Sequence, residues 1–225
     1  MSDILREVDE ELRHERYKKL WDRYGLYVIG VAVLVVLAVA GWRGWEWYAA
    51  RQAAEASARF ESAMQLSREG KGAESEAAFN QLAKDGTSGY RTLARFRAAA
   101  EAAKGDTKAG VAAFDALAAD SSLESPMRDI ARLQAAYRLV DTASVAEIKG
   151  RVDSLAVAGG PFRHSANEII GLAHYRAGEV EQAAKVFASI VGDPETPPAL
   201  RQRVLVMNAL VAGTAPAKPS APATQ

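Results

Sequence analysis

Residues that could transfer protons or bind a metal occur in this sequence, but none forms a pattern that catalysis needs. The three histidines, His14, His164 and His174, lie far apart and lack ligand partners at helical spacing. The Gly159-Gly160-Pro161 turn lacks the strand–turn–helix context of a phosphate-binding loop. We therefore predict no enzyme activity, no metal site and no cofactor.

The composition excludes further classes of function. The 225 residues include 28 Lys and Arg and 28 Asp and Glu, so the formal net charge is zero. A nucleic-acid-binding domain would show a strongly basic footprint, and we predict no nucleic-acid partner. The chain has no cysteine, which excludes disulfides, thiolate catalysis and cysteine-based metal sites. The features that indicate a function are the apolar stretch near the N-terminus and the repeated pattern that follows it.

One stretch near the N-terminus has the length and composition of a transmembrane helix. Residues 24–42 contain no charged side chain, and Arg23 and Arg43 flank them. A helix of this length measures about 28 Å, close to the hydrocarbon thickness of a bilayer. A soluble helix of the same length would show a polar face, and this one shows none.

Aromatic residues gather at both ends of this stretch. All four tryptophans of the chain lie there. An amphipathic ring is favoured at a membrane–water boundary, whereas a soluble core would scatter the tryptophans. The predicted membrane-interface residues are Trp21, Tyr24, Trp42 and Trp45.

The basic residues around the span predict its orientation. Six Lys and Arg precede it, and three fall in the twenty residues after it, which favours a cytoplasmic N-terminus. Ala38-Val39-Ala40 has the form of a signal-peptidase site, so a cleaved signal is the alternative. The 23 preceding residues, seven of them acidic, and the long apolar run favour an uncleaved anchor. Either way, the rest of the chain lies outside the cytoplasm.

A repeated pattern follows the span. Its four copies begin at Phe79, Phe114, Val152 and Phe187, at intervals of 35, 38 and 35 residues. Three copies have a glycine nine residues before the aromatic residue: Gly70, Gly105 and Gly178. A period near 34 residues with a glycine turn between two helices is the tetratricopeptide signature.

Small residues in the fourth copy have a predicted packing role. Gly171 and Ala183 let the two helices of the unit approach closely, and Phe187 fills the space beside them. In the third copy Val152 replaces the aromatic residue, so we expect a distorted repeat with uncertain boundaries.

These patterns predict an all-α fold: one N-terminal transmembrane helix, then a tetratricopeptide-like α-solenoid of about four helix pairs with a C-terminal capping helix. The capping helix covers residues 198–211, with an apolar stripe that includes Leu210. The predicted segments are a cytoplasmic part (1–23), the transmembrane helix (24–42), a helical connector (43–57), the repeat domain (58–211) and a disordered tail (212–225).

A repeat array of this kind presents a concave side in which helices or extended peptides can lie. By analogy with tetratricopeptide domains, the first helix of each pair lines that side. Packing between repeats is the alternative role for such residues, but a core would not choose Arg or Glu. The predicted partner-binding residues are Met64, Arg95, Glu168 and Tyr175.

The layout resembles the YfgM-like family, the ancillary subunit of the bacterial SecYEG translocon. The resemblance covers about residues 15–211. It includes the short charged segment before a single span, Gly41-Trp42-Arg43 with Trp45 at the outer edge of that span, and degenerate repeats ending in Pro197-Pro198-Ala199-Leu200.

This resemblance implies a single-pass protein of the bacterial inner membrane with its repeats in the periplasm. The implied partners are the SecYEG translocon, a PpiD-type periplasmic chaperone and secretory chains that pass between them. The alternative is a structural coordinator of envelope or cell-division machinery that uses the same repeats on other protein partners.

Overall fold

The computed structural model describes the backbone of residues 2–214 and the side chains of Lys18 and residues 21–213. Residues 215–225, most of the predicted tail, lie outside the described residues. The described part forms nine α-helices and one short 3₁₀ helix, without a strand, which confirms the all-α prediction. It divides into two compact units, residues 1–55 and 56–225.

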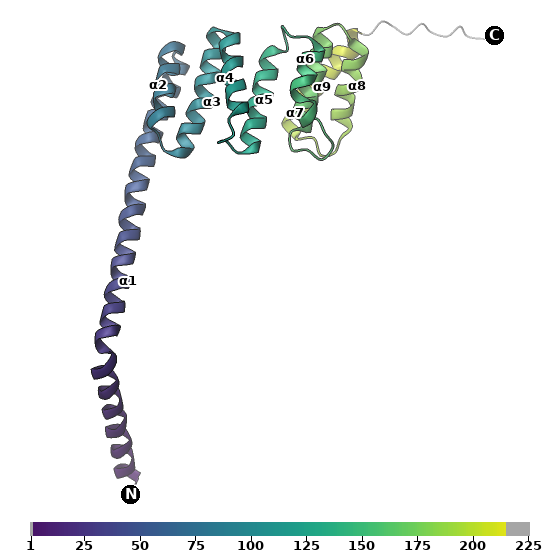
Figure 1. Cartoon of the computed structure of the whole chain (residues 1–225). Helices are drawn as coiled ribbons and strands as arrows, with labels where there is room; N and C mark the ends of the chain where they lie inside the picture. Colours follow the sequence, from purple (N-terminus) through teal and green to yellow (C-terminus); the bar gives the residue numbers. More distant parts are fainter. Residues whose placement is uncertain (1, 215–225) are drawn as a thin grey trace, which may run out of the picture. The chain divides into compact units, whose positions relative to one another are not determined.

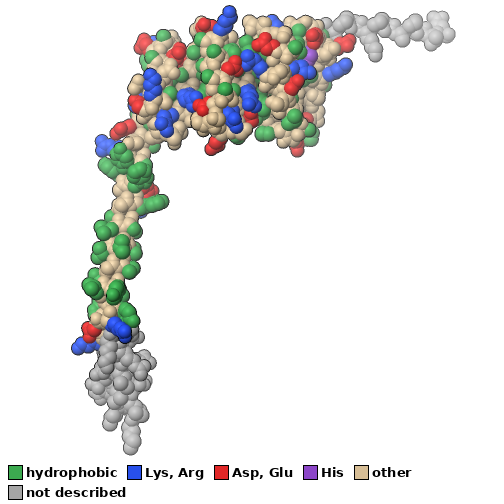
Figure 2. Space-filling view, viewed as in Figure 1, with side chains coloured by type: hydrophobic (Ala, Val, Ile, Leu, Met, Phe, Trp, Pro, Cys, Tyr) green, Lys and Arg blue, Asp and Glu red, His purple; other side chains and the backbone are tan. Residues whose placement is uncertain are grey.

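The first unit consists of the larger part of helix α1, which runs from Ser2 to Arg68. This helix contains one stretch that is long and apolar enough to cross a membrane. Apolar side chains point outward along it (Figure 2), and Leu34 is 68% exposed. The predicted connector, residues 43–57, is helical throughout.

The second unit contains four helix pairs and a final helix, as predicted. The last part of α1 pairs with α2 (Gly72–Asp85). The next pairs are α3 (Ser88–Gly105) with α4 (Thr107–Ala119), α5 (Ser125–Leu139) with α6 (Val145–Val152), and α7 (Arg163–Arg176) with α8 (Val180–Gly192). Helix α9 (Pro198–Thr214) follows. Consecutive helices from α2 to α9 pack against each other, and α2 to α5 follow one another in chain order in Figure 1.

Four buried clusters hold this array together, and the last one seals its end. Phe187 and Ile190 of α8 pack there with Val204 of α9, which confirms the predicted capping helix. Leu210, which was predicted to belong to the apolar stripe of this helix, does not share the buried face of Val204, because it is 47% exposed. It follows Val204 by six residues, which places it about 120° away around the helix.

The predicted close approach of α7 and α8 is present. A Cβ built on Gly171 would lie 2.6 Å from the Cε1 atom of Phe187, so only glycine leaves room for the ring. Ala183 and Phe187 are fully buried in the same contact. In the first pair, Ser75 takes the place of Ala183 and donates a hydrogen bond of 2.9 Å to the carbonyl oxygen of Ala63.

The turns inside the pairs differ from one another. Gly70 and Gly178 adopt left-handed φ values of 77° and 75°, which favour glycine. Gly105, expected in the same role, is instead the last residue of α3. Asp106 then caps α4, its side chain accepting a hydrogen bond of 2.8 Å from the amide of Lys108. An aspartate cap therefore replaces the glycine turn in the second pair.

The third pair is distorted, as expected. Helix α6 has only eight residues and continues into a 3₁₀ helix (η1, Asp153–Leu155). Ile148 and Val152 are fully buried and fill the space beside α5 and α7. Arg176 of α7 donates hydrogen bonds to the carbonyl oxygens of Asp141 and Ala143, which fixes the longer turn between α5 and α6.

Candidate protein-binding surface

The exposed large apolar residues of the repeat unit are concentrated on the first helices of the pairs. With α9 counted as a first helix, every one of them in the described part except Val157 lies on α3, α5 or α9. They are Leu93, Tyr137, Val157, Leu205, Val206 and Leu210. Single exposed apolar residues are ordinary, but their concentration on the first helices makes that side of the repeat unit the candidate binding surface.

A cavity of about 550 Å³ lies among α5, α7 and α9. This volume is in the range of sites that bind ligands or anchor side chains. Its lining combines apolar residues with a few polar groups: Ile130, Leu133, Gln134, Tyr137, Phe162, Ser165, Glu168, Ile169 and Arg203. We call this cavity and its lining the α5–α7–α9 groove.

One ion pair supplies the charge of the groove. The Glu168 carboxylate, only 9% exposed as a residue, accepts hydrogen bonds from Nε and Nη2 of Arg203 at 3.1 and 2.8 Å. The carboxylate raises the pKa of the Arg203 guanidinium, whose side chain remains mostly exposed. Because the two charges cancel, the groove suits an apolar segment that brings hydrogen-bonding groups rather than a strongly charged ligand.

Tyr137 stands at the groove with 58% of its surface exposed. A tyrosine with an exposed ring and a polar hydroxyl is a frequent anchor in protein interfaces. Tyr137 is not among the predicted partner-binding residues, because the distorted pattern of the third repeat predicts none there. Its position on the first helix of that pair was the available signal.

Of the four predicted partner-binding residues, Glu168 lines the groove. Tyr175, on the same helix, is half-buried against the core shared by α7, α8 and α9. Met64 is half-buried against the core of the first pair. The structure thus gives Tyr175 and Met64 packing contacts, and a role in binding a partner stays a prediction for all four residues.

Arg95 lines a different cavity, of about 240 Å³, beside the second helices α2 and α4. Its Nη2 atom lies 2.6 Å from a carboxylate oxygen of Asp120, just after α4. Hydrogen bonds from Ser122 and then from Arg95 lower the pKa of Asp120 to about 2. The structure therefore does not bring Arg95 and Glu168 to one site.

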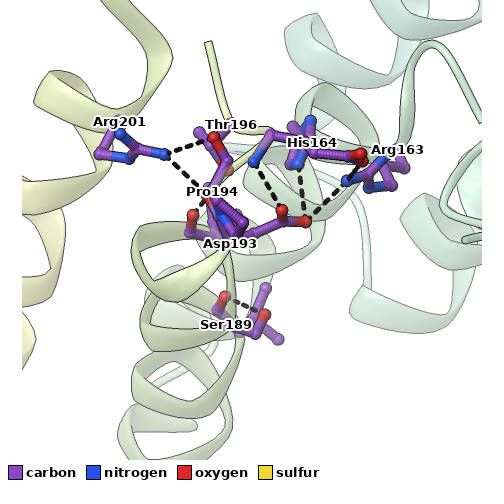
Figure 3. A network of polar contacts seen from close by, with 10 residues as sticks. Arg163, His164, Ser189, Asp193, Pro194, Thr196 and Arg201 are labelled. Carbon is purple, nitrogen blue, oxygen red and sulfur yellow. Dashed lines mark hydrogen bonds and ion pairs between the residues drawn. The ribbon is translucent and has the colours of Figure 1, made fainter. Parts of the chain in front are cut away.

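The histidines whose side chains are described make structural contacts, while the side chain of His14 lies outside the described ones. His164 and Arg163 lie 3.0 and 2.8 Å from the same carboxylate oxygen of Asp193 (Figure 3). Arg163, more than His164, lowers the pKa of Asp193. This network ties the loop between α8 and α9 to the start of α7.

The hydroxyl groups near this network also make structural contacts, and Thr196 donates a hydrogen bond of 2.7 Å to the carbonyl oxygen of Ile190. Ser189, drawn beside the network in Figure 3, donates its hydroxyl to the carbonyl oxygen of Val186 in its own helix, at 2.7 Å. His174 instead approaches Glu179, with 2.6 Å between Nδ1 and Oε2. No group of three His, Asp or Glu side chains that could hold a metal occurs among the residues described.

Comparison with known proteins identifies the architecture. The family model described as a tetratricopeptide repeat-like domain matches residues 18–202. The match includes the apolar stretch at residues 24–42 together with all four helix pairs. No curated protein and no solved structure gives a significant match.

Proposed function

The chain belongs to the tetratricopeptide repeat-like domain family, and we propose on this basis that it is a membrane-anchored scaffold that binds other proteins. The observation that carries the proposal is the α5–α7–α9 groove, in which first helices present an apolar floor, one neutralised ion pair and the exposed ring of Tyr137. Such a groove accepts an apolar side chain of a helix or an extended peptide.

The anchor in this proposal is the stretch at residues 24–42, uncleaved and surrounded by lipid. Its exposed Val and Leu side chains support this, as does a family match that begins before the stretch. The six basic residues before it support an orientation with the N-terminus in the cytoplasm and the repeats on the other side. A protease added outside intact spheroplasts should digest the repeats, and their protection would contradict this orientation.

We further propose that the scaffold is an ancillary factor of the SecYEG translocon in the bacterial inner membrane. It would link secretory chains to a PpiD-type periplasmic chaperone. The resemblance at Gly41-Trp42-Arg43 and Trp45 supports this assignment. The alternative is a coordinator of envelope or division machinery, which would concentrate at the septum, whereas a translocon factor would be distributed along the whole membrane.

A pair of photo-crosslinking variants tests the groove. A crosslinking amino acid replaces Tyr137 in one variant and Gln182, an exposed residue of second helix α8, in the other. In intact membranes the Tyr137 variant should capture translocon or chaperone subunits, and the Gln182 variant should not. Equal capture from both positions, or capture of cell-wall enzymes alone, would contradict the proposal.

A further inference from the structure

Helix α9 is apolar on two opposite sides. Leu200, Val204 and Val211 are buried against α8. The opposite side carries an uncharged, solvent-exposed stripe with spacings of three and four residues: Gln202, Leu205, Val206, Ala209, Leu210 and Gly213. A helix that is apolar on both sides is expected to be covered on both sides.

The repeat spacing shows what the exposed side lacks. Helix α9 begins 35 residues after α7, so Val206 occupies the position of Gly171. Gly171 is covered by Phe187 from the second helix of its own pair. Val206 is 69% exposed, because the described chain provides α9 with no second helix. Helix α9 thus occupies the position of a first helix, and no helix of the described residues covers this side of it.

The charges of α9 disfavour lipid as the cover. A helix that lies on a membrane surface presents free Lys or Arg beside its apolar face. Arg201 and Arg203 are the only charged residues of α9. Arg201 donates to the carbonyl oxygen of Asp193 and Arg203 donates to Glu168, so both are engaged within the repeat unit.

The stripe is complementary to itself under a two-fold axis. In an antiparallel pair of α9 helices, Val206 faces Ala209 of the second copy, and Gln202 faces Gly213 of the second copy. Leu205 and Leu210, about 140° apart around the helix, lie on the two edges of the stripe and flank these contacts. Each medium or long side chain in the first two contacts meets a small one, and no charge is brought against its like.

We propose that a second copy of this chain covers the stripe, through an antiparallel pair of α9 helices. The stripe contains none of the residues that line the α5–α7–α9 groove. The inference does not depend on what the groove binds. Anchoring in one membrane would favour the contact further by raising the effective concentration of the chain.

Cysteine crosslinking of the full chain in membranes tests this proposal, since the natural sequence contains no cysteine. In the antiparallel pair the two Ala209 positions lie about 4.5 Å apart along the helix axis. A short bismaleimide should therefore convert the Ala209→Cys variant to a covalent dimer. The matched control is Ala188→Cys, which changes an exposed alanine of α8 and should stay monomeric.

A second substitution tests whether the exposed stripe of α9 forms the contact between the two copies. Val206→Asp adds a charge to the stripe and should reduce dimer formation by the Ala209→Cys variant about tenfold or more. Val157→Asp, at an exposed residue outside the stripe, should leave dimer formation unchanged. Circular dichroism checks that both variants keep their helices.

Three results would overturn the proposal. The first is an equal dimer yield from Ala209→Cys and Ala188→Cys. The second is a dimer yield that Val206→Asp leaves unchanged in a folded protein. The third is an Ala209→Cys variant that stays monomeric and reacts with a water-soluble maleimide only after detergent is added, which would identify lipid as the cover.

Discussion

Residues 24–42 of α1 and helix α8 are both rich in valine and alanine, yet their apolar side chains have opposite surroundings. In α8 the buried residues Ala183, Phe187 and Ile190 form one stripe that faces α7 and α9. In α1 the valines and leucines are exposed on every side of the helix, and Val36 is 65% exposed.

The difference shows that apolar composition alone does not define a protein core. A stripe needs a neighbouring helix, whereas an apolar surface all around a helix needs an apolar solvent. Each exposed Val or Leu gains about 1.5–3 kcal/mol when it leaves water. Summed over residues 24–42, this free energy favours lipid as the environment of the stretch. In the repeats, neighbouring helices provide the apolar environment.

The largest expected effect is on the stability of the repeat unit, where other helices surround the apolar side chains. Phe187→Ala should lower the free energy of unfolding of the repeat unit by about 3–5 kcal/mol, because it empties a fully buried ring site. Leu34→Ala should leave that free energy unchanged. Denaturant unfolding of both variants in detergent, followed by circular dichroism, compares them. Similar losses in the two would remove the distinction between the regions.

A charged substitution in residues 24–42 tests whether lipid surrounds this stretch. Val36→Arg should cost about 2.5–3.5 kcal/mol of membrane insertion, because a guanidinium near the centre of the bilayer is poorly solvated. Leu93→Arg, at an exposed site of α3, is the control and should insert normally. Alkaline extraction of membranes measures the inserted fraction, and equal extraction of the two variants would argue against lipid around Val36.

A smaller effect is expected from glycine-to-alanine substitutions in the repeats, and its sign depends on how closely the neighbouring helix packs. Gly171→Ala should destabilise the repeat unit by about 1–3 kcal/mol, because its Cβ would meet the ring of Phe187 at 2.6 Å. Gly150→Ala, in helix α6 with open space around the new Cβ, should stabilise it by about 0.5–1 kcal/mol. Thermal unfolding of both variants measures whether each substitution raises or lowers stability. A stabilising Gly171→Ala would contradict the tight contact.

The smallest expected effect is a pH dependence. The pKa of Asp120 is lowered from 3.8 to about 2 in the folded protein, so its contacts stabilise the repeat unit fully above pH 4. That contribution is lost as the pH falls from about 4 through 2. Asp120→Asn should therefore make unfolding less sensitive to acid in this window. An unchanged acid transition in the variant would show that the contacts of Asp120 with Ser122 and Arg95 contribute nothing to stability.

Much of the fold was predictable because its signals are local and periodic. The spacing of Phe79, Phe114 and Phe187 predicted the helix pairs, and Gly171 predicted the close approach of α7 and α8. Gly105 did not form the expected turn, because Asp106 caps the next helix at once. A sequence pattern cannot distinguish these two ways of turning the chain.

The candidate site was less predictable, because it depends on contacts between helices. Glu168 was predicted on the concave side and lines the α5–α7–α9 groove, but its ion-pair partner Arg203 lies 35 residues further along the chain, in the next first helix. Arg95 was predicted by the same reasoning and instead faces the second helices. The rotation of a first helix within its pair, which decides between the two outcomes, follows from packing rather than from spacing.

Labelling of single cysteines in intact membrane vesicles tests most directly whether lipid surrounds the apolar stretch. The measurement compares Leu34→Cys with Ala188→Cys, using a water-soluble maleimide on vesicles whose repeats face outward. We predict that the Ala188→Cys variant reacts at once, whereas the Leu34→Cys variant reacts only after detergent dissolves the bilayer. Equally rapid labelling of both in intact vesicles would contradict the account.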